Sequence, residues 1–421
     1  MVCVVIPFGM GYNDGSRLST GHVKEGRMKG SLRIGRIAGI EIGVHYTWLF
    51  AFFLIGVSLA QGYFGGFYPN WSSTAHWVAG FLSAVLLFVG VLLHELAHSL
   101  VARMRGLPVA SITLFIFGGV SNLSEEPESP GVEFWMAIVG PLTSLAIGLL
   151  AWVIWFAATG SVGLPMLMQS RPLDFGFATG ILGYVAFINM ALAVFNLLPG
   201  FPLDGGRVFR SIVWKVSGNL VTSTNIAATI GRVFGWGFIA LGVFMFFRFG
   251  DFISAIWIAI IGVFLNSAAE GTRQEVALKE HLAGVRVAQA MEVNTDTVSP
   301  NMSVADLVRD VFLMRRRRAI PVAEGSEIVG MVSVSDVRDL PQEQWNVTPV
   351  TTIMTRPPVH TVSPEDDLGA ALKLIAQYDL NQVPVVSHGK LVGLLSRANV
   401  ISFMQMRQEL GSRRGRVSRP A

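Results

Sequence analysis

The sequence predicts an all-α membrane protein with a six-helix polytopic core and a short re-entrant β segment, followed by a C-terminal α/β pair of repeated modules. Composition is the first reason: 52% of the 421 residues are hydrophobic and only 14% are charged, whereas soluble domains carry roughly 25% charged residues. The second reason is the distribution of charge. Residues 270–421 contain 18 Lys or Arg and 17 Asp or Glu, whereas residues 37–269 contain only 8 and 9. An internal repeat in the charged part is the third reason.

This shift in composition predicts the domain organisation. The expected parts are a basic N-terminal extension (1–36), a six-span membrane domain (37–269), a linker (270–284), two repeat units (285–342 and 347–405) and a basic tail (406–421). The basic ends favour membrane topology and lipid contact over nucleic-acid binding. The single cysteine, Cys3, excludes an intrachain disulfide and a cysteine-based metal site. Either Met1 or Met28 could be the first residue.

Apolar segments predict the six membrane crossings in order. The expected spans cover about 46–63, 76–103, 134–158, 175–198, 227–247 and 252–265. Between the second and third spans, the apolar and β-branched segment 111–120 is too short to cross a bilayer and contains Gly118-Gly119 near its end. This segment therefore predicts a re-entrant hairpin or a strand that is buried in protein.

Basic residues predict the orientation. Six crossings put both chain termini on one side of the membrane. That side would carry the basic N-terminal segment, Arg103, Arg105, Arg207, Arg210, Lys215 and the C-terminal units, and the opposite side only Arg171 and Arg248. The positive-inside rule then predicts a multi-pass protein of the cell membrane with both termini and both repeat units in the cytoplasm.

A candidate metal-binding motif lies at the end of the second span. The stretch from His94 to His98 is HELAH, which matches H-E-x-x-H. On a helix the two histidines share one face and can bind one metal ion. Glu95 follows the first histidine, where zinc proteases with this motif keep their general base. The alternative is a pair of helix histidines bonded to neighbours or lipid headgroups, but such polar groups in hydrocarbon need a compensating ligand.

A catalytic zinc ion needs a third protein ligand. Asp204 is a candidate because it is the only acid between Asp174 and Asp251 and lies in the turn-rich break 199–207. The alternative is a helix N-cap, because Asp204 precedes Gly205-Gly206 and an amphipathic stretch. Spacing alone leaves these two interpretations equally open.

Two stretches resemble the signatures of the site-2 protease family of intramembrane metalloproteases. One is His94–His98, and the other is Asn196–Gly205, which fits N-x-x-P-x-x-P-x-D-G at every fixed position. Phe115–Gly119 and Gly140-Pro141 also resemble that family. The resemblance covers roughly residues 30–270. It implies a zinc metalloendopeptidase that cleaves single-span membrane proteins in or near their transmembrane segment, as in regulated intramembrane proteolysis.

The resemblance also implies a role for each motif residue. His94, His98 and Asp204 would bind one zinc ion per chain, with water as the fourth ligand. Glu95 would act as the catalytic base. Asn196 would hydrogen-bond the substrate or the oxyanion, although an amide that only packs helices is the alternative. Gly118-Gly119 would let a substrate strand add to the edge of segment 111–120, and a plain tight turn is the alternative.

The C-terminal repeat has a period of 63 residues, as Pro321 and Pro384 show. Thr297-Val-Ser-Pro300 recurs as Thr361-Val-Ser-Pro364. Each copy is expected to contain strand, helix, strand, strand and helix, and resembles a cystathionine-β-synthase-type (CBS) domain over its whole length. A tandem CBS pair implies a sensor that binds an adenine nucleotide such as ATP or AMP, and a possible homodimer through these domains.

Three polar residues are candidates for nucleotide binding. Ser335 and Asp336 lie where the resemblance implies a ribose-binding acid, and Asn399 occupies the place of Asp336 in the second copy. The basic run Arg315–Arg318 would either contact phosphate or form a solvated face. The chain has no Walker-type loop, so a bound nucleotide would regulate rather than be hydrolysed.

Two other classes of function stay open. A metal transporter or channel gated by the CBS pair would use HELAH as a transport site and predicts polar residues through several spans. An inactive scaffold would bind membrane partners without cleaving them. The polar residues of this chain gather at one depth on one face, which favours the protease. The expected partners are single-span membrane proteins and the lipid bilayer, and not nucleic acid.

Overall fold

The computed structural model describes residues 31–116, 118–123, 127–164, 175–250, 252–293, 296–325, 327–356, 360–378 and 380–414. These residues form two compact units, one ending at Ala277 and one beginning at Leu278. Cys3, Met28 and most of the predicted extension 1–36 lie outside the described residues. The same holds for Arg171, Asp174, Asp251 and the end of the predicted tail 406–421.

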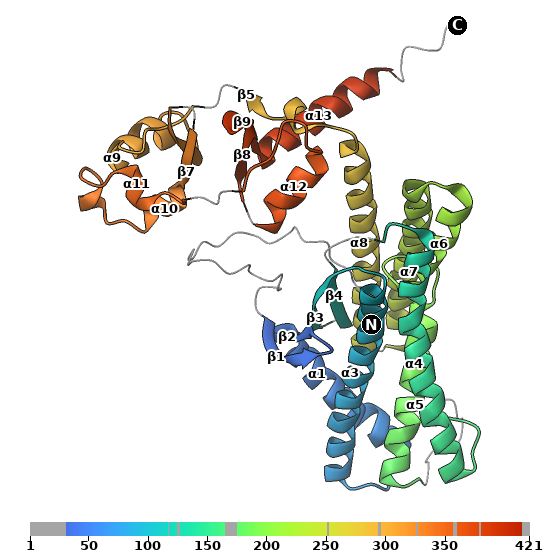
Figure 1. Cartoon of the computed structure of the whole chain (residues 1–421). Coiled ribbons are helices and arrows are strands. Elements are labelled where there is room, and N and C mark those ends of the chain that lie inside the picture. The colour runs from blue at the N-terminus through green and yellow to red at the C-terminus, as the bar shows by residue number, and fades with distance from the viewer. Residues whose placement is uncertain are drawn as a thin grey trace, which may run out of the picture. The chain divides into compact units, whose positions relative to one another are not determined.

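Among the described residues, six helical segments are long and apolar enough to cross a membrane, which confirms the predicted six-span core (Figure 1). They are α1 (Tyr46–Ser58) with η1 (Leu59–Phe64) and α2 (Gly65–Phe67), α3 (Ser73–Met104), α4 (Pro130–Thr159), α5 (Phe177–Asn196), α7 (Leu220–Phe249) and α8 (Phe252–Leu282). The amphipathic stretch after the turn-rich break forms α6 (Asp204–Ser217).

Helix α8 continues beyond the predicted sixth span, which was expected to end near Leu265. It runs without a break to Leu282 and so includes most of the predicted linker 270–284. The residues that follow the apolar part are mostly Ala, Glu, Gln, Lys and Leu, which are strong helix formers. The helix therefore continues past the end of its apolar residues.

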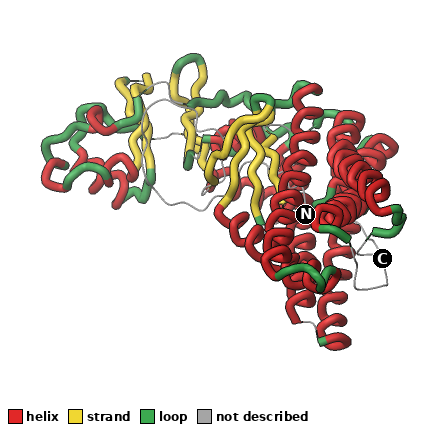
Figure 2. Tube along the Cα trace, turned by 90° about the horizontal axis from the view of Figure 1, so that it is seen from below, coloured by secondary structure: helices red, strands yellow, loops and turns green. Residues whose placement is uncertain are grey.

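A four-stranded sheet belongs to the same unit as the spans, and Figure 2 shows its strands in yellow beside the helices. The strand order is β1 (Ser31–Ile37), β2 (Ile40–His45), β3 (Val109–Phe115) and β4 (Gly118–Leu123). β1 and β2 are antiparallel, β2 and β3 are parallel, and β3 and β4 are antiparallel. The predicted re-entrant segment 111–120 thus forms most of the β3–β4 hairpin.

Strands β1 and β2 were not expected from the sequence, which assigned residues 1–36 to an extension. They form a hairpin whose two turn residues, Ala38 and Gly39, have φ of 49° and 79°. Such two-residue turns need positive φ at both positions, so Asn-Gly or Asp-Gly is their usual sequence signal. Ala38 stands at the first position, so the sequence lacks that signal. Residues 31–36 of the predicted extension therefore belong to the sheet.

The sheet packs against the part of α3 that carries the HELAH motif. Ile40, Ile42 and Ile112 form a buried cluster with Leu92 and Leu96 of α3. These two leucines flank the motif's first histidine in the sequence. The contact fixes the sheet relative to the motif, so that β4 can reach the side chains of α3.

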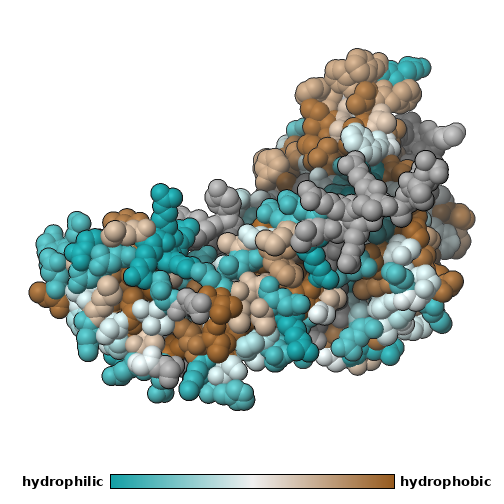
Figure 3. Space-filling view, turned by 90° about the horizontal axis from the view of Figure 1, so that it is seen from above, coloured by the Kyte–Doolittle hydropathy of each residue, from teal (hydrophilic) through white to brown (hydrophobic). Residues whose placement is uncertain are grey.

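Apolar side chains also cover much of the outer surface of the spans. Phe53, Leu150 and Phe247 are examples of large apolar residues that are more than 60% exposed. Figure 3 shows such side chains in brown on the face in view. Exposed apolar surface on long apolar helices is the surface that a bilayer covers, as expected for a multi-pass membrane protein.

The second unit contains the two repeats, each with its own buried core. Its strands are β5 (Glu292–Val293), β6 (Ala319–Glu324), β7 (Glu327–Ser333), β8 (Gln382–Ser387) and β9 (Lys390–Ser396). Its helices are η3 (Val287–Gln289), α9 (Val304–Asp306), η4 (Leu307–Leu313), α10 (Val334–Arg338), η5 (Gln342–Gln344), α11 (Val350–Ile353), α12 (Leu368–Gln377) and α13 (Arg397–Arg414). β6 pairs with β7 and β8 with β9, and the two prolines that are 63 residues apart occupy equivalent places in β6 and β8.

The two repeats exchange short segments. β5 of the first repeat pairs with β9 of the second, and Thr355 of the second repeat pairs with Met331 of β7 in the first. An ion pair accompanies this exchange, because Arg317 Nη1 donates to Glu292 Oε2 at 2.7 Å. The hydrogen bonds from Arg317 hold the pKa of the Glu292 carboxyl below its usual range. The two modules therefore form one unit rather than two independent ones.

Candidate metal centre

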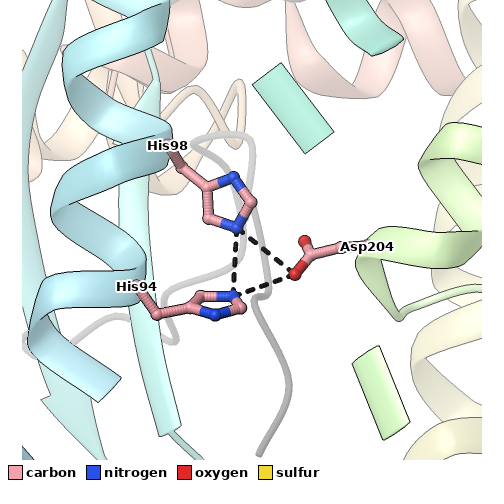
Figure 4. A group of neighbouring side chains, drawn as sticks. All are labelled: His94, His98 and Asp204. Carbon is pink, nitrogen blue, oxygen red and sulfur yellow. Dashed lines mark hydrogen bonds and ion pairs between the residues drawn. The ribbon is translucent and has the colours of Figure 1, made fainter. Parts of the chain in front are cut away.

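Helix α3 carries His94 and His98 on its buried face, one turn apart. Asp204, the first residue of α6, reaches the same point from the opposite side (Figure 4). Its Oδ2 lies 3.0 Å from His94 Nε2 and 3.2 Å from His98 Nε2, and the two Nε2 atoms are 3.1 Å apart. The three residues are at most 6% exposed. Residues 110 positions apart in the sequence thus meet at one buried point.

The segment before Asp204 is held tightly against α7. Phe201 N donates to the Ala227 carbonyl at 3.2 Å, and a Cβ on Gly231 would lie 1.8 Å from the Phe201 carbonyl oxygen. The N-cap residue of α6 is Leu203, and its cap position has no side-chain hydrogen bond. Asp204 is therefore not the N-cap that the sequence left open; its carboxylate faces the histidines instead.

The three ligand atoms have the arrangement that a small cation needs. A tetrahedral zinc site with bonds of about 2.0–2.1 Å places its ligand atoms roughly 3.3 Å apart. The remaining ring nitrogens are already engaged: His94 Nδ1 lies 2.9 Å from Ser144 Oγ, and His98 Nδ1 donates to the Met136 carbonyl at 2.5 Å. Such partners leave Nε2 free for a metal. The residues present therefore fit a zinc ion.

The backbone of α4 forms a wall directly beside these atoms. A Cβ on Gly140 would lie 2.1 Å from His98 Nε2 and 2.7 Å from His94 Nε2. Real Cβ atoms do not approach other atoms so closely, so only glycine fits at this position while both imidazoles keep their places. The Gly140-Pro141 pair of the sequence therefore has a steric role at the candidate centre.

Strand β4 covers Glu95, the residue that follows His94. Ser121 Oγ donates to Glu95 Oε2 at 3.0 Å, and Ser99 Oγ lies 3.2 Å from Ser121 Oγ. Gly119 faces the same side chain, since a Cβ there would lie 2.3 Å from Glu95 Cγ. Residues two apart on a strand share a face, and here that face holds the carboxylate of Glu95.

Comparison with known proteins agrees with this geometry. The family model for Peptidase family M50 matches residues 82–238, and that for the CBS domain matches residues 287–343 and 350–405. Zinc metalloprotease MJ0392 of Methanocaldococcus jannaschii is 30% identical over 91% of this chain and 99% of its own length. A Synechocystis protein provisionally named zinc metalloprotease sll0528 is 33% identical over 90% of this chain and 96% of its own. A solved structure, the site-2 protease from Methanocaldococcus jannaschii, is 30% identical, covering 58% of this chain and 95% of its own, with a TM-score of 0.39.

The chain belongs to peptidase family M50. This M50 peptidase is a zinc metalloprotease and a multi-pass membrane protein with a pair of CBS domains, which confirms the resemblance drawn from its motifs.

One predicted residue of the M50 domain does not join the cluster. Asn196 is the last residue of α5 and is 3% exposed. Its Oδ1 has no hydrogen-bond partner within the described part of the chain. No hydrogen bond between described residues links it to the two histidines or to Asp204. A role for Asn196 at the substrate therefore stays a prediction.

Two of the three candidate nucleotide residues of the M50 peptidase, Asp336 and Asn399, cap helices. Asp336 Oδ2 accepts hydrogen bonds from the Ser333 backbone N and from Ser333 Oγ, both at 2.7 Å, at the start of α10. In the second repeat, Asn399 Oδ1 accepts in the same way from Ser396 at the start of α13. Ser335 is exposed. The two equivalent positions thus share a structural role, whatever ligand they bind.

Sequence reasoning missed the residues that support the centre of this M50 peptidase. Ser144 and the Met136 carbonyl orient the histidines, and Ser121 holds Glu95. A backbone carbonyl carries no residue identity, and serines within apolar segments are common. Only Ser144 has a recognisable position, because it lies one helical turn after Gly140 and therefore on the same face of the helix.

Proposed function

We propose that this M50 peptidase hydrolyses a peptide bond in or near the membrane-spanning segment of a single-span protein. One observation carries the proposal: the three candidate ligands and Glu95 are buried among helices long and apolar enough to cross a bilayer. A substrate that reaches such a site must come from within or beside the membrane.

His94, His98 and Asp204 would hold the zinc ion through Nε2, Nε2 and Oδ2. Zinc at such a site lowers the pKa of a water molecule towards about 7 and polarises the peptide carbonyl. Ser144 and the Met136 carbonyl keep the imidazoles in the orientation that this binding needs.

Glu95 is the proposed general base. Its carboxylate takes a proton from the attacking water as the new C–O bond forms, and gives a proton to the amine nitrogen as the C–N bond breaks. Ser121 fixes one carboxylate oxygen, Oε2. Asn196, which has an unpartnered oxygen within the described part of the chain, would hydrogen-bond the substrate backbone.

Strand β4 is the proposed docking edge for the substrate. The sheet order gives β4 a single neighbour, β3, among the described strands. An unwound substrate segment can add to such an edge through backbone hydrogen bonds. Since Gly119 and Ser121 of β4 face Glu95, a strand bound there would lie close to the base. The distribution of Lys and Arg favours a cytoplasmic location for this sheet, the termini and the CBS pair.

Removal of zinc tests the proposed reaction. Treating the purified peptidase in proteoliposomes with a chelator is expected to stop cleavage of a co-reconstituted single-span protein, and added Zn²⁺ should restore it. His94→Phe removes a ligand and should stay inactive with added zinc. His76→Phe is the matched control, because His76 lies on the same helix and its Nε2 contacts the Tyr68 carbonyl at 2.9 Å rather than a candidate ligand. Cleavage by His94→Phe at the wild-type rate would contradict the ligand role of His94, whereas no cleavage by the zinc-loaded wild type would indicate a scaffold.

We further propose that the CBS pair binds an adenine nucleotide and regulates the peptidase, with Ser335 and Asp336 at the ribose and Asn399 in the weaker half-site. A homodimer through the CBS domains also stays a prediction. Two observations support the proposal: the two similar modules exchange segments, and the family model for CBS domains matches both.

Calorimetry on the full-length peptidase tests nucleotide binding. Asp336→Ala is expected to weaken ATP or AMP binding about tenfold, the loss of one hydrogen bond to a charged group. Asp367→Ala removes a carboxylate helix cap, because Asp367 Oδ1 accepts from Ala370 N at 3.1 Å at the start of α12, and serves as the control for lost capping, with near-normal affinity expected. If the wild-type chain releases no heat with either nucleotide, the regulatory proposal is wrong.

A further inference from the structure

A buried ion pair joins α4 to α6 beside the candidate centre. Arg210 Nε donates to Glu133 Oε1 at 2.8 Å, and Nη2 of the same guanidinium donates to the same oxygen. Glu133 is 0% exposed and Arg210 only 4%. Arg207 Nε lies farther away, 3.8 Å from that oxygen. None of the roles assigned above uses this pair.

Arg210 is also the point where several segments meet. Its Nη1 lies 3.4 Å from Thr224 Oγ1 of α7, and its guanidinium carbon lies 5.1 Å from the centre of the Phe201 ring. A planar guanidinium can make such contacts in several directions at once, which an ammonium cannot. One side chain thus joins α6, α4, α7 and the loop that leads to Asp204.

The two partners lie on the helices that carry or orient the candidate ligands. Glu133 precedes Met136 by three residues on α4, and the Met136 carbonyl accepts the hydrogen bond from His98 Nδ1. Arg210 follows Asp204 by six residues on α6. The ion pair therefore connects the helix that orients His98 to the helix that begins with Asp204.

Stability alone is a poor reason for this pair. Removing two charges from water costs several kcal/mol per ion, and apolar side chains of similar size often serve a fold equally well. Glu133 Oε2 has no hydrogen-bond partner among the described residues, so the carboxylate is only half satisfied. In some proteins a buried polar or ionic pair instead specifies one arrangement of the elements that it joins.

We propose that Glu133 and Arg210 are positioning residues that hold Asp204 against the two histidines and thereby set the metal affinity of the centre. This inference rests on the proposed ligand set. Ligands of a metal site must be held within roughly 0.5 Å of their working positions. Asp204 opens α6, so a rotation or slide of that helix would carry its carboxylate away from His94 and His98. The ion pair to α4 prevents this movement.

Cobalt binding by the full-length peptidase tests the proposal. Metal-free wild type, Arg210→Met and Arg207→Met in detergent are titrated with Co²⁺ against a competing chelator, and the visible absorption of bound Co²⁺ reports its coordination geometry. Arg210→Met is expected to bind Co²⁺ roughly 10–100-fold more weakly, with an altered spectrum. Arg207→Met, on the same helix but 3.8 Å from the carboxylate oxygen, should change the affinity less than about threefold.

Each result decides one question. A wild-type chain that binds no Co²⁺ refutes the proposed ligand set itself. Wild-type affinity and spectrum in folded Arg210→Met refute the positioning role while leaving the ligand set intact. Should Arg210→Met aggregate, Glu133→Gln and Arg210→Lys take its place. Glu133→Gln keeps the size of the side chain but loses its charge, and Arg210→Lys keeps the charge but loses the planar fork. Wild-type Co²⁺ binding in both would overturn the proposal.

Discussion

Glu95→Gln is expected to lower the rate of peptide cleavage by roughly 10²–10⁴-fold, the usual contribution of a general base, while zinc stays bound. Glutamine has the shape of glutamate and can still accept the hydrogen bond from Ser121, so the structure around the base should persist. Its amide, however, cannot take a proton from water. The measurement is cleavage of a single-span protein in proteoliposomes, with the zinc content of the same sample determined by atomic absorption.

The pairing of the two readouts separates the protease from a transporter. His94→Phe should lose both zinc and cleavage, whereas Glu95→Gln should lose only cleavage. In a transporter that uses the motif to carry metal, Glu95→Gln would lower metal uptake and leave cleavage unchanged. Lower metal uptake with undiminished cleavage in Glu95→Gln would therefore contradict the catalytic role of Glu95.

Gly140→Ala is expected to weaken metal binding strongly although residue 140 supplies no ligand atom. The added methyl group would lie 2.1 Å from His98 Nε2 and 2.7 Å from His94 Nε2. Because α4 packs closely against α3 and α5, the imidazoles must give way, and their Nε2 atoms leave Asp204. We expect metal affinity to fall roughly 100-fold or more, beyond the effect of losing one supporting hydrogen bond, and cleavage to be lost with it.

A matched alanine controls for the change in backbone freedom. Gly131 lies on the same helix, and a Cβ there would meet nothing within 4 Å. Gly131→Ala should bind zinc normally and unfold at the wild-type temperature or slightly above, since alanine favours helices. Normal zinc content in Gly140→Ala would show that the imidazoles have more room than the packing of α4 indicates.

Much of the fold follows from composition, because an apolar run long enough to cross a bilayer has few alternatives to a helix. The exceptions have physical reasons. β1 and β2 depend on a turn whose first residue, Ala38, carries no turn signal, and on pairing with β3 some 70 residues later. The length of α8 depends on helix propensity beyond the apolar part, which hydropathy does not measure.

The candidate site was predictable only where its residues lie close in sequence. HELAH places two ligands and a base within one helical turn, whereas Asp204 lies 110 residues from His94 and needed the family signature. The Glu133–Arg210 pair spans 77 residues, and no local pattern relates its members. The same is true of Ser121, which meets Glu95 only because the sheet packs on α3.

The parallel pairing of β2 with β3 has a consequence for how this protein is made. Glu41–Val44 pair with Ser111–Leu114, and the chain between them contains two of the candidate membrane spans. During synthesis, β3 does not exist until both of those spans have been translated, so β2 cannot pair with it earlier. β4, whose Gly119 and Ser121 lie against Glu95, follows β3 in the chain. The nascent protein thus cannot complete the sheet beside its candidate centre until its first two candidate spans have been made.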